Sequence, residues 1–80
     1  MDELLLSTVV KIEWVSDRLA PQDVKARHIG RVVTFFYGAD AVAVTGTLER
    51  CEGSHLLVSG DIYDYSQMGS LKIWRKAIAR

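Results

Sequence analysis

The chain of 80 residues has few of the groups from which disulfide frameworks, metal centres and membrane spans are built. Its single cysteine, Cys51, rules out an internal disulfide, and one cysteine with two histidines cannot supply a four-ligand zinc site. No segment approaches the roughly 18 consecutive apolar residues that span a bilayer. The apolar run at residues 4–6 follows acids, whereas a signal peptide begins with basic residues. We therefore expect a soluble, cytoplasmic protein with no membrane partner.

Sequence motifs of catalysis and nucleotide binding are missing as well. Neither GxxxxGK nor GxGxxG, the patterns that hold phosphates and dinucleotides, occurs in the chain. Cys51 and His55 are four residues apart, but their segment is typical of strand–turn–strand, where this spacing does not bring a nucleophile to its base. Asp61 and Asp64 do not have the spacing of a calcium-binding EF-hand loop. We predict that the protein is not an enzyme and uses no cofactor, metal or small-molecule substrate.

Charge of either sign is balanced overall but unevenly distributed. Ten basic and ten acidic residues cancel, which argues against a protein that coats DNA. After Asp64 the chain has no acid, and its basic residues there fall together, at Lys72, Arg75, Lys76 and Arg80. A second basic group is Lys25, Arg27, His28 and Arg31. Solvated strand faces are the simplest interpretation of both groups, and a phosphate-binding patch is the alternative.

What the chain does have is an alternation of apolar and polar residues with a period of two, typical of strands with one buried face. Five strands are predicted, at residues 4–15, 31–37, 41–50, 55–63 and 71–78. The only proline, Pro21, falls in a connection before one short helical turn at residues 23–29, which Gly30 would end.

The same alternation predicts which side chains are buried. In the first strand Leu4, Leu6, Val10, Ile12 and Trp14 share the buried face. The predicted core of the middle strands is Val33, Phe35, Val42, Val44, Leu48, Leu56, Val58 and Ile62. Gly46 and Gly60 take inward positions within strands, where glycine suits a sharp bend. In the last strand Leu71 and Ile73 lie on one face and Trp74 and Ile78 on the other, so we expect a bulge or a helical turn near Arg75.

These patterns predict an all-β fold, mainly β with one short helical turn, in a single domain over residues 1–80. Short strands with inward glycines favour a small five-stranded curled sheet or barrel of SH3/Sm-like or OB-like type. A sandwich is not expected, because 80 residues cannot furnish two full sheets.

Residues 23–62 carry a pattern of strand, turn glycine, strand, bend glycine and leucine, with an acid after it: Val33, Phe35, Gly38, Val42, Val44, Gly46, Leu48 and Glu52. This pattern resembles the first motif of the Sm-like family, small five-stranded barrels that form rings and often bind RNA. The base-contacting asparagine of that family has no counterpart, since Leu56 or His55 stands there. Its second motif, isoleucine–arginine–glycine, is matched only at Arg75, because Lys76 replaces the glycine. The resemblance implies a curled barrel.

Several apolar residues are left over once the predicted core is filled. Val9, Val32, Phe36 and Trp74 lie on the other faces of their strands. Exposed together they would form a patch larger than monomers usually show, so we expect a homo-oligomer.

The functional hypothesis is a non-enzymatic protein-binding or assembly module, a small accessory, inhibitor or structural factor of the kind that phages also encode. It would act through edge strands, an apolar outer face and the Tyr63–Met68 loop. The predicted partner-binding residues are Tyr63, Asp64, Tyr65, Met68 and Trp74, since exposed aromatic residues are favoured in interfaces. The alternative is a nucleic-acid-binding barrel that uses Arg31, Lys72, Trp74, Arg75, Lys76 and Arg80, where bases stack on rings and cations contact phosphates.

Overall fold

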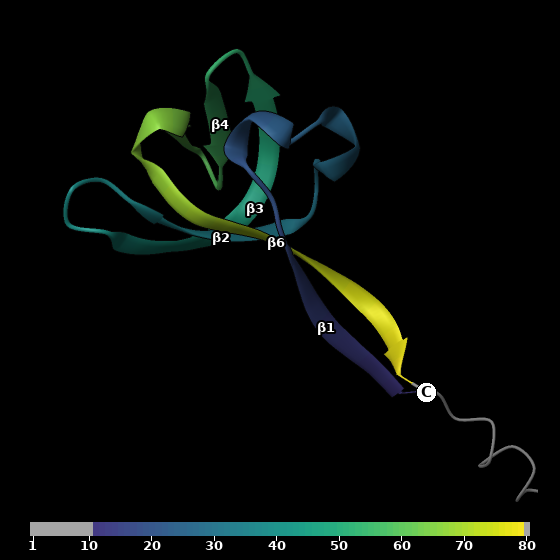
Figure 1. The fold of residues 1–80 in the computed structure, drawn as a ribbon. Helices are drawn as coiled ribbons and strands as arrows, with labels where there is room; N and C mark the ends of the chain where they lie inside the picture. Colours follow the sequence, from purple (N-terminus) through teal and green to yellow (C-terminus); the bar gives the residue numbers. More distant parts are fainter. Residues whose placement is uncertain (1–10, 80) are drawn as a thin grey trace, which may run out of the picture.

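The computed structural model describes residues 11–79 and shows a small all-β fold (Figure 1). Antiparallel pairing builds one six-stranded sheet in the order β1-β6-β2-β3-β4-β5, so the sheet is curled but not closed into a barrel. The strands are β1 (Lys11–Arg18), β2 (Val32–Tyr37), β3 (Val42–Glu52), β4 (His55–Val58), β5 (Asp61–Asp64) and β6 (Met68–Ala79). Three short 3-10 turns, η1 (Pro21–Asp23), η2 (Ala26–His28) and η3 (Tyr65–Gln67), complete the chain.

The strand β3 holds the two halves of the sheet together because it changes partner along its length. Its residues up to Thr47 pair with β2, and from Leu48 onward it pairs with β4. A Cβ on Gly46 would collide with the Ser59 hydroxyl and lie 2.8 Å from Val58 Cγ1. Gly46 therefore permits the close approach of β3 to the β4–β5 turn at the bend, as the sequence predicts.

The second predicted bend glycine, Gly60, has a different role, and the prediction of a single strand at residues 55–63 is wrong. Ser59 and Gly60 have φ values of 46° and 88° and form a two-residue hairpin turn between β4 and β5. Such a turn reverses which residues face inward, because Leu56 now pairs with Tyr63 and Leu57 with Ile62. Ile62, predicted in the core, is consequently 70% exposed.

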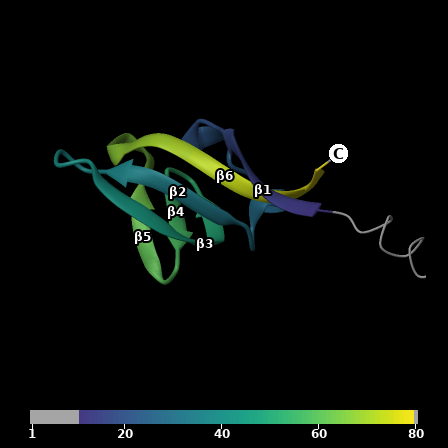
Figure 2. The ribbon, with the colours of Figure 1, turned by 90° about the horizontal axis from the view of Figure 1, so that it is seen from below.

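The hydrophobic core lies between the two halves of the curled sheet. Figure 2 shows the course of the strands from below. Its buried residues are Val24, Val33, Phe35, Leu48, Leu56, Val58, Leu71 and Ile73. This confirms five of the eight residues predicted for the core of the middle strands, and a sixth, Val44, is half-buried against that core. Besides Ile62, Val42 is exposed because it lies at the tip of the β2–β3 hairpin, where it pairs with Tyr37.

The first strand departs most from expectation, since Ile12 and Trp14 are 64% and 56% exposed rather than buried. Strand β2 accompanies β6 only as far as the pair Val33–Ile73. Beyond it, β1 and β6 continue as a two-stranded ribbon that projects from the body (Figure 1). Residues 11–16 and 74–79 are called the ribbon below. Leu4, Leu6, Val9 and Val10, also predicted to be apolar strand residues, lie outside the described residues.

The irregularity expected near Arg75 lies elsewhere on β6. The pairing of β1 with β6 is continuous from Lys11–Ala79 to Arg18–Lys72. The register against β2 shifts instead between Phe36–Gly69 and Thr34–Lys72, around Ser70, whose φ is 54°. This bulge lets Leu71 and Ile73 face the core.

In place of the single helical turn predicted at residues 23–29, the structure has the two 3-10 turns η1 and η2. The last residue of η2, His28, is buried. The Lys25 backbone N–H donates to His28 Nδ1 at 2.9 Å. Burial, together with the nearby Arg27 and Arg31 charges, holds the pKa of His28 below its usual value of 6.5. On acidification, His28 is therefore protonated at a higher pH in the unfolded chain than in the folded chain. The free energy of unfolding is not reduced by this residue above pH 6.5, and it falls as the pH is lowered below that value.

We predict that His28→Asn keeps the acceptor for the Lys25 N–H but removes this pH dependence. Urea unfolding of the parent should show a midpoint that falls as the pH is lowered from 6.5, whereas the variant should show a flatter profile over the same range. His55→Asn, which changes an exposed histidine, is the control and should keep the parent's slope. Equal slopes in all three proteins would contradict the prediction.

The bend at Gly46 predicts a local intolerance to a methyl group. Gly46→Ala should destabilise the protein by about 1–3 kcal/mol, because Val58 and Ser59 must move to admit the Cβ. Gly69→Ala, also in a strand but with open space around the added Cβ, is the matched control and should change stability little. Chemical unfolding of both variants measures the difference. If the two variants are equally stable, the bend accommodates a Cβ at position 46 and the prediction is wrong.

Candidate functional site

One side of the sheet, opposite the core, carries the exposed aromatic residues Trp14 and Phe36 together with several basic residues. Side chains of directly paired residues share a face, so the register places Thr34 beside Thr45 and Lys72, and Trp14 beside Lys76. We call this side the outer face; its residues are Ile12, Trp14, Ser16, Arg18, Val32, Thr34, Phe36, Ala43, Thr45, Thr47, Lys72, Trp74, Lys76 and Ile78. None of these described residues is a carboxylate.

An open hollow of about 310 Å³ lies on the outer face where the ribbon joins the body. Its lining consists of Trp14, Val32, Thr34, Thr45 and Trp74. The Trp74 indole Nε1–H donates to Thr34 Oγ1 at 3.1 Å, which fixes this ring against β2. Trp14 has no such anchor among the described hydrogen bonds and projects from the edge strand β1. The hollow thus has one fixed and one adjustable aromatic wall.

Three cationic side chains surround this hollow. Lys76 Nζ lies 5.4 Å from the centre of the Trp14 ring, a cation–π arrangement. Arg31 Nε donates to the Trp74 carbonyl oxygen at 3.3 Å. Lys72 lines the adjoining depression with Thr34 and Trp74.

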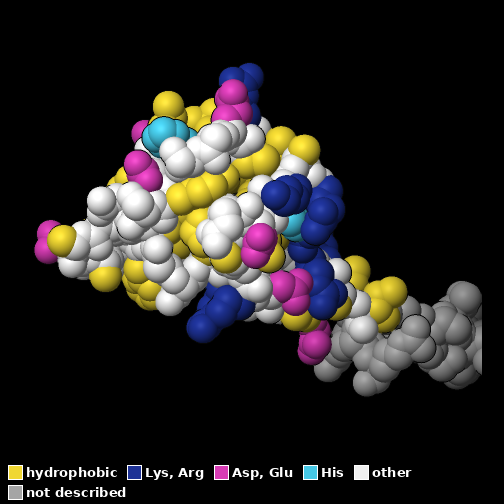
Figure 3. Space-filling model, turned by 45° about the horizontal axis from the view of Figure 1, so that its top comes forward, with side chains coloured by type: hydrophobic (Ala, Val, Ile, Leu, Met, Phe, Trp, Pro, Cys, Tyr) yellow, Lys and Arg dark blue, Asp and Glu magenta, His cyan; other side chains and the backbone are white. Residues whose placement is uncertain are grey.

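The acids of β1, Glu13 and Asp17, lie on the other face of the β1–β6 pair. Arg75 Nε donates to Asp17 Oδ2 at 2.7 Å, and Asp17 is directly opposite Ile73, whose side chain faces the core. Glu13 alternates onto the same side as Asp17. Figure 3 shows acidic and basic side chains mixed where the body meets the ribbon. The strands therefore separate a mixed-charge face from a purely basic one.

The predicted partner-binding residues do not come together on one surface. Tyr63 packs edge-on against Phe35 and Tyr37, with ring centres 5.0 and 4.9 Å apart. Tyr65 and Met68 are half-buried against the same core, and burial raises the pKa of the Tyr65 hydroxyl. These side chains line the inner rim, whereas Trp74 lies on the outer face. The segment predicted as a loop is the end of β5, the turn η3 and the start of β6.

Asp64 stabilises the turn η3. Its Oδ1 accepts from the Ser66 backbone N–H and from the Ser66 hydroxyl, each at 2.8 Å. These hydrogen bonds, with a smaller contribution from the His55 ring 3.9 Å away, hold the pKa of Asp64 below its usual value. A structural role in ending β5 is thus established by contacts within the chain.

The predicted nucleic-acid residues are brought together in part. Arg31, Arg75 and Lys76 line a depression beside the hollow together with both tryptophans, and Lys72 lines another. The Arg75 guanidinium also pairs with Asp17, which alternates onto the other face of the strand pair. Arg80 lies outside the described residues. Sequence reasoning missed Trp14 as their neighbour, since alternation assigned it to a buried face. Pairing the first strand with the last would have placed the two tryptophans on the same side.

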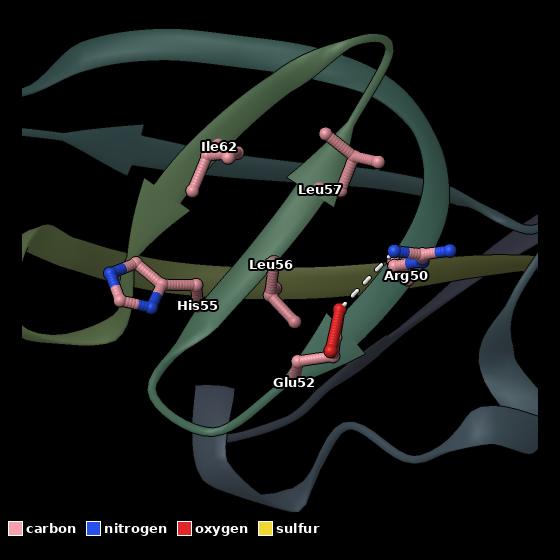
Figure 4. A pocket seen from close by; sticks show the side chains of 6 residues that line it. All are labelled: Arg50, Glu52, His55, Leu56, Leu57 and Ile62. Atoms are coloured by element: carbon pink, nitrogen blue, oxygen red, sulfur yellow. Dashed lines mark hydrogen bonds and ion pairs between the residues drawn. The ribbon is translucent and has the colours of Figure 1, made fainter.

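A second hollow, of about 400 Å³, lies over the hairpin of β4 and β5 (Figure 4). Leu57 and Ile62 are direct cross-strand partners on this face, and the Arg50–Glu52 ion pair lies at 3.4 Å beside it. His55 contacts Ser54 Oγ at 3.4 Å, whereas Cys51 packs against the core. The described contacts therefore do not join Cys51 to His55 as nucleophile and base.

Comparisons with known protein families, with curated proteins and with solved structures found no match for this chain. Within residues 11–79 no group of three His, Cys, Asp or Glu side chains is placed to hold a metal ion. The helical segments of this part of the chain are too short to cross a membrane.

The Asp64 contacts predict a measurable shift. Ser66→Ala removes one of the two donors to the carboxylate, so the pKa of Asp64 should rise toward its usual value of 3.8. Because a lowered carboxyl pKa stabilises the fold above that value and the benefit is lost on acidification, the variant should also show a smaller loss of stability below about pH 4. Carboxyl NMR titration measures the pKa, with Ser16→Ala as a remote control. An unchanged pKa in Ser66→Ala would contradict the assigned hydrogen bond.

Proposed function

We propose that this protein is a non-enzymatic assembly module that associates with further copies of itself through the ribbon of β1 and β6. The observation that supports this proposal is the exposure of apolar side chains on a two-stranded projection. Ile12 and Ile78 are direct cross-strand partners near its end, and both are exposed, as is Trp14. Within residues 11–79 no other strand or turn covers them.

Two physical arguments favour association at this place. An isolated two-stranded ribbon is marginal in water, so it gains from contact with a further layer. Ile12 and Ile78 are 64% and 61% exposed, so burying what remains of the two side chains contributes roughly 2–4 kcal/mol per protomer before the cost of association. In addition, β1 is the end strand of the described sheet, and its free edge offers backbone donors and acceptors to an added strand.

A second copy is a suitable occupant because charge does not oppose it at the ribbon. The chain has a formal net charge of zero, which removes long-range repulsion between copies. The ribbon face that carries Glu13 and Arg75 holds both signs of charge, so two ribbons can approach with opposite charges facing. The edge strand β5, with Leu57, Ile62 and the Tyr63–Met68 segment beside it, remains as a smaller contact for a different protein.

Ribbon-mediated assembly predicts that a polar ribbon yields a monomer. Ile12→Thr combined with Ile78→Thr keeps β-branched residues in the strands but removes the apolar contact, so the mass should fall to 9.0 kDa. Light scattering over a range of concentrations measures the mass, and the parent should exceed the monomer value. The matched control, Val42→Thr with Ile62→Thr, changes exposed strand residues outside the ribbon and should assemble as the parent does.

Two results would reject the proposal. One is a parent protein that stays at the monomer mass at the highest concentrations; the other is a ribbon double variant that assembles as strongly as the parent. Circular dichroism and unfolding of each variant establish that the loss of mass reflects lost contact and not lost fold.

A further inference from the structure

We infer that the outer face around Trp14 and Trp74 is a binding site for single-stranded nucleic acid, a function separate from assembly through the ribbon end. The inference starts from the hollow between the two indoles, which is open and lined by aromatic, aliphatic and threonine side chains. An open depression with aromatic walls accepts flat rings, and every nucleobase has such a face for stacking.

The charge of this face decides which partner fits. Lys72, Lys76 and Arg31 lie around the hollow, and the described residues of the outer face include no carboxylate. In a chain with no net charge this separation of signs creates a local positive field that favours an anionic partner. Two copies brought together at the hollow would place Lys72 and Lys76 of one copy opposite the same cations of the other, so a second copy is disfavoured at the hollow, in contrast to the apolar end of the ribbon at Ile12 and Ile78.

The arrangement of rings and cations favours a single strand over other polyanions. Lys76 lies over the Trp14 ring, and Arg31 is held at the Trp74 backbone, so each indole has a cation within reach of it. A single strand presents bases and phosphates alternately, which matches rings interleaved with cations. A duplex hides the faces of its bases, and an acidic peptide has no rings to occupy the hollow.

The affinity for a single strand should fall as the salt concentration rises, and the number of phosphates that Arg31, Lys72 and Lys76 contact should determine how steeply it falls. Neutralising about three phosphates gives a slope near −2 in a plot of log affinity against log salt, since each contact contributes about −0.7 for single strands. The experiment titrates the full chain with oligo-dT and oligo-U of about eight nucleotides, within the usual site size of a small domain. Quenching of tryptophan fluorescence reports stacking, and anisotropy of a labelled oligonucleotide reports binding.

Two sets of variants test the contributions of charge and of stacking. Lys72→Ala with Lys76→Ala should weaken binding at least about tenfold at low salt and reduce the slope by about 1.4. The matched control, Lys25→Ala with Arg50→Ala, removes the same charge from exposed positions away from the hollow and should keep the parent's slope. Trp14→Ala should weaken binding at least about fivefold, and Trp14→Phe should restore most of it, because a ring remains for stacking.

The outcomes separate this inference from the proposed assembly. The ribbon variant Ile12→Thr with Ile78→Thr should bind the short oligonucleotide as tightly as the parent even when it is a monomer. If this variant no longer binds the oligonucleotide, the inference that one protomer holds the whole site is wrong. No binding to either oligonucleotide at low salt overturns the inference outright. If poly-glutamate or a duplex binds as tightly as the single-stranded oligonucleotides, without quenching tryptophan fluorescence, the inference is overturned. The outer face would then be a surface that binds polyanions in general.

Discussion

The pairing of β6 with two neighbours of different length shapes everything else in this protein. Its first half, up to Ile73, pairs with β2 and contributes Leu71 and Ile73 to the core, whereas β1 pairs with it only from Lys72 to Ala79, so that beyond Ile73 it has only β1 beside it. Because β6 is longer than the part of it that β2 pairs with, its residues beyond Ile73 extend away from the body of the sheet. The exposed ribbon is the direct consequence, and with it comes a set of apolar side chains that the small core cannot cover.

The same pairing also creates the outer face. Trp74 lies at the last point where β6 is still close to β2, and the register of β1 brings Trp14 to the neighbouring position on the same side. Alternation along β1 and β6 sends Glu13, Asp17 and Arg75 to one face and Lys72 and Lys76 to the other. A neutral chain thereby acquires a basic aromatic surface without any excess of basic residues. The proposed assembly and the inferred nucleic-acid site both depend on this geometry.

Periodicity predicted the elements well where strands are paired on both sides and poorly where the chain turns. In β2, the order "VVTFFY" gives the correct inward residues, Val33 and Phe35, because this strand is central. At Ser59–Gly60 a two-residue turn reverses the inward parity, so an alternation that continues through the turn assigns Ile62 to the wrong side. Leu56, Val58 and Ile62 at this spacing, with Gly60 between, are compatible both with one strand and with a hairpin.

From the amino-acid sequence alone follow the all-β class, most of the core and the bend at Gly46, because these depend on local alternation and on the absence of a side chain. Tertiary structure decided which strands are neighbours, and hence that Ile12 and Trp14 are exposed and that Trp14 meets Trp74. Burial of a strand face depends on what is packed against it, and that is a property of pairing between residues about 60 positions apart along the chain.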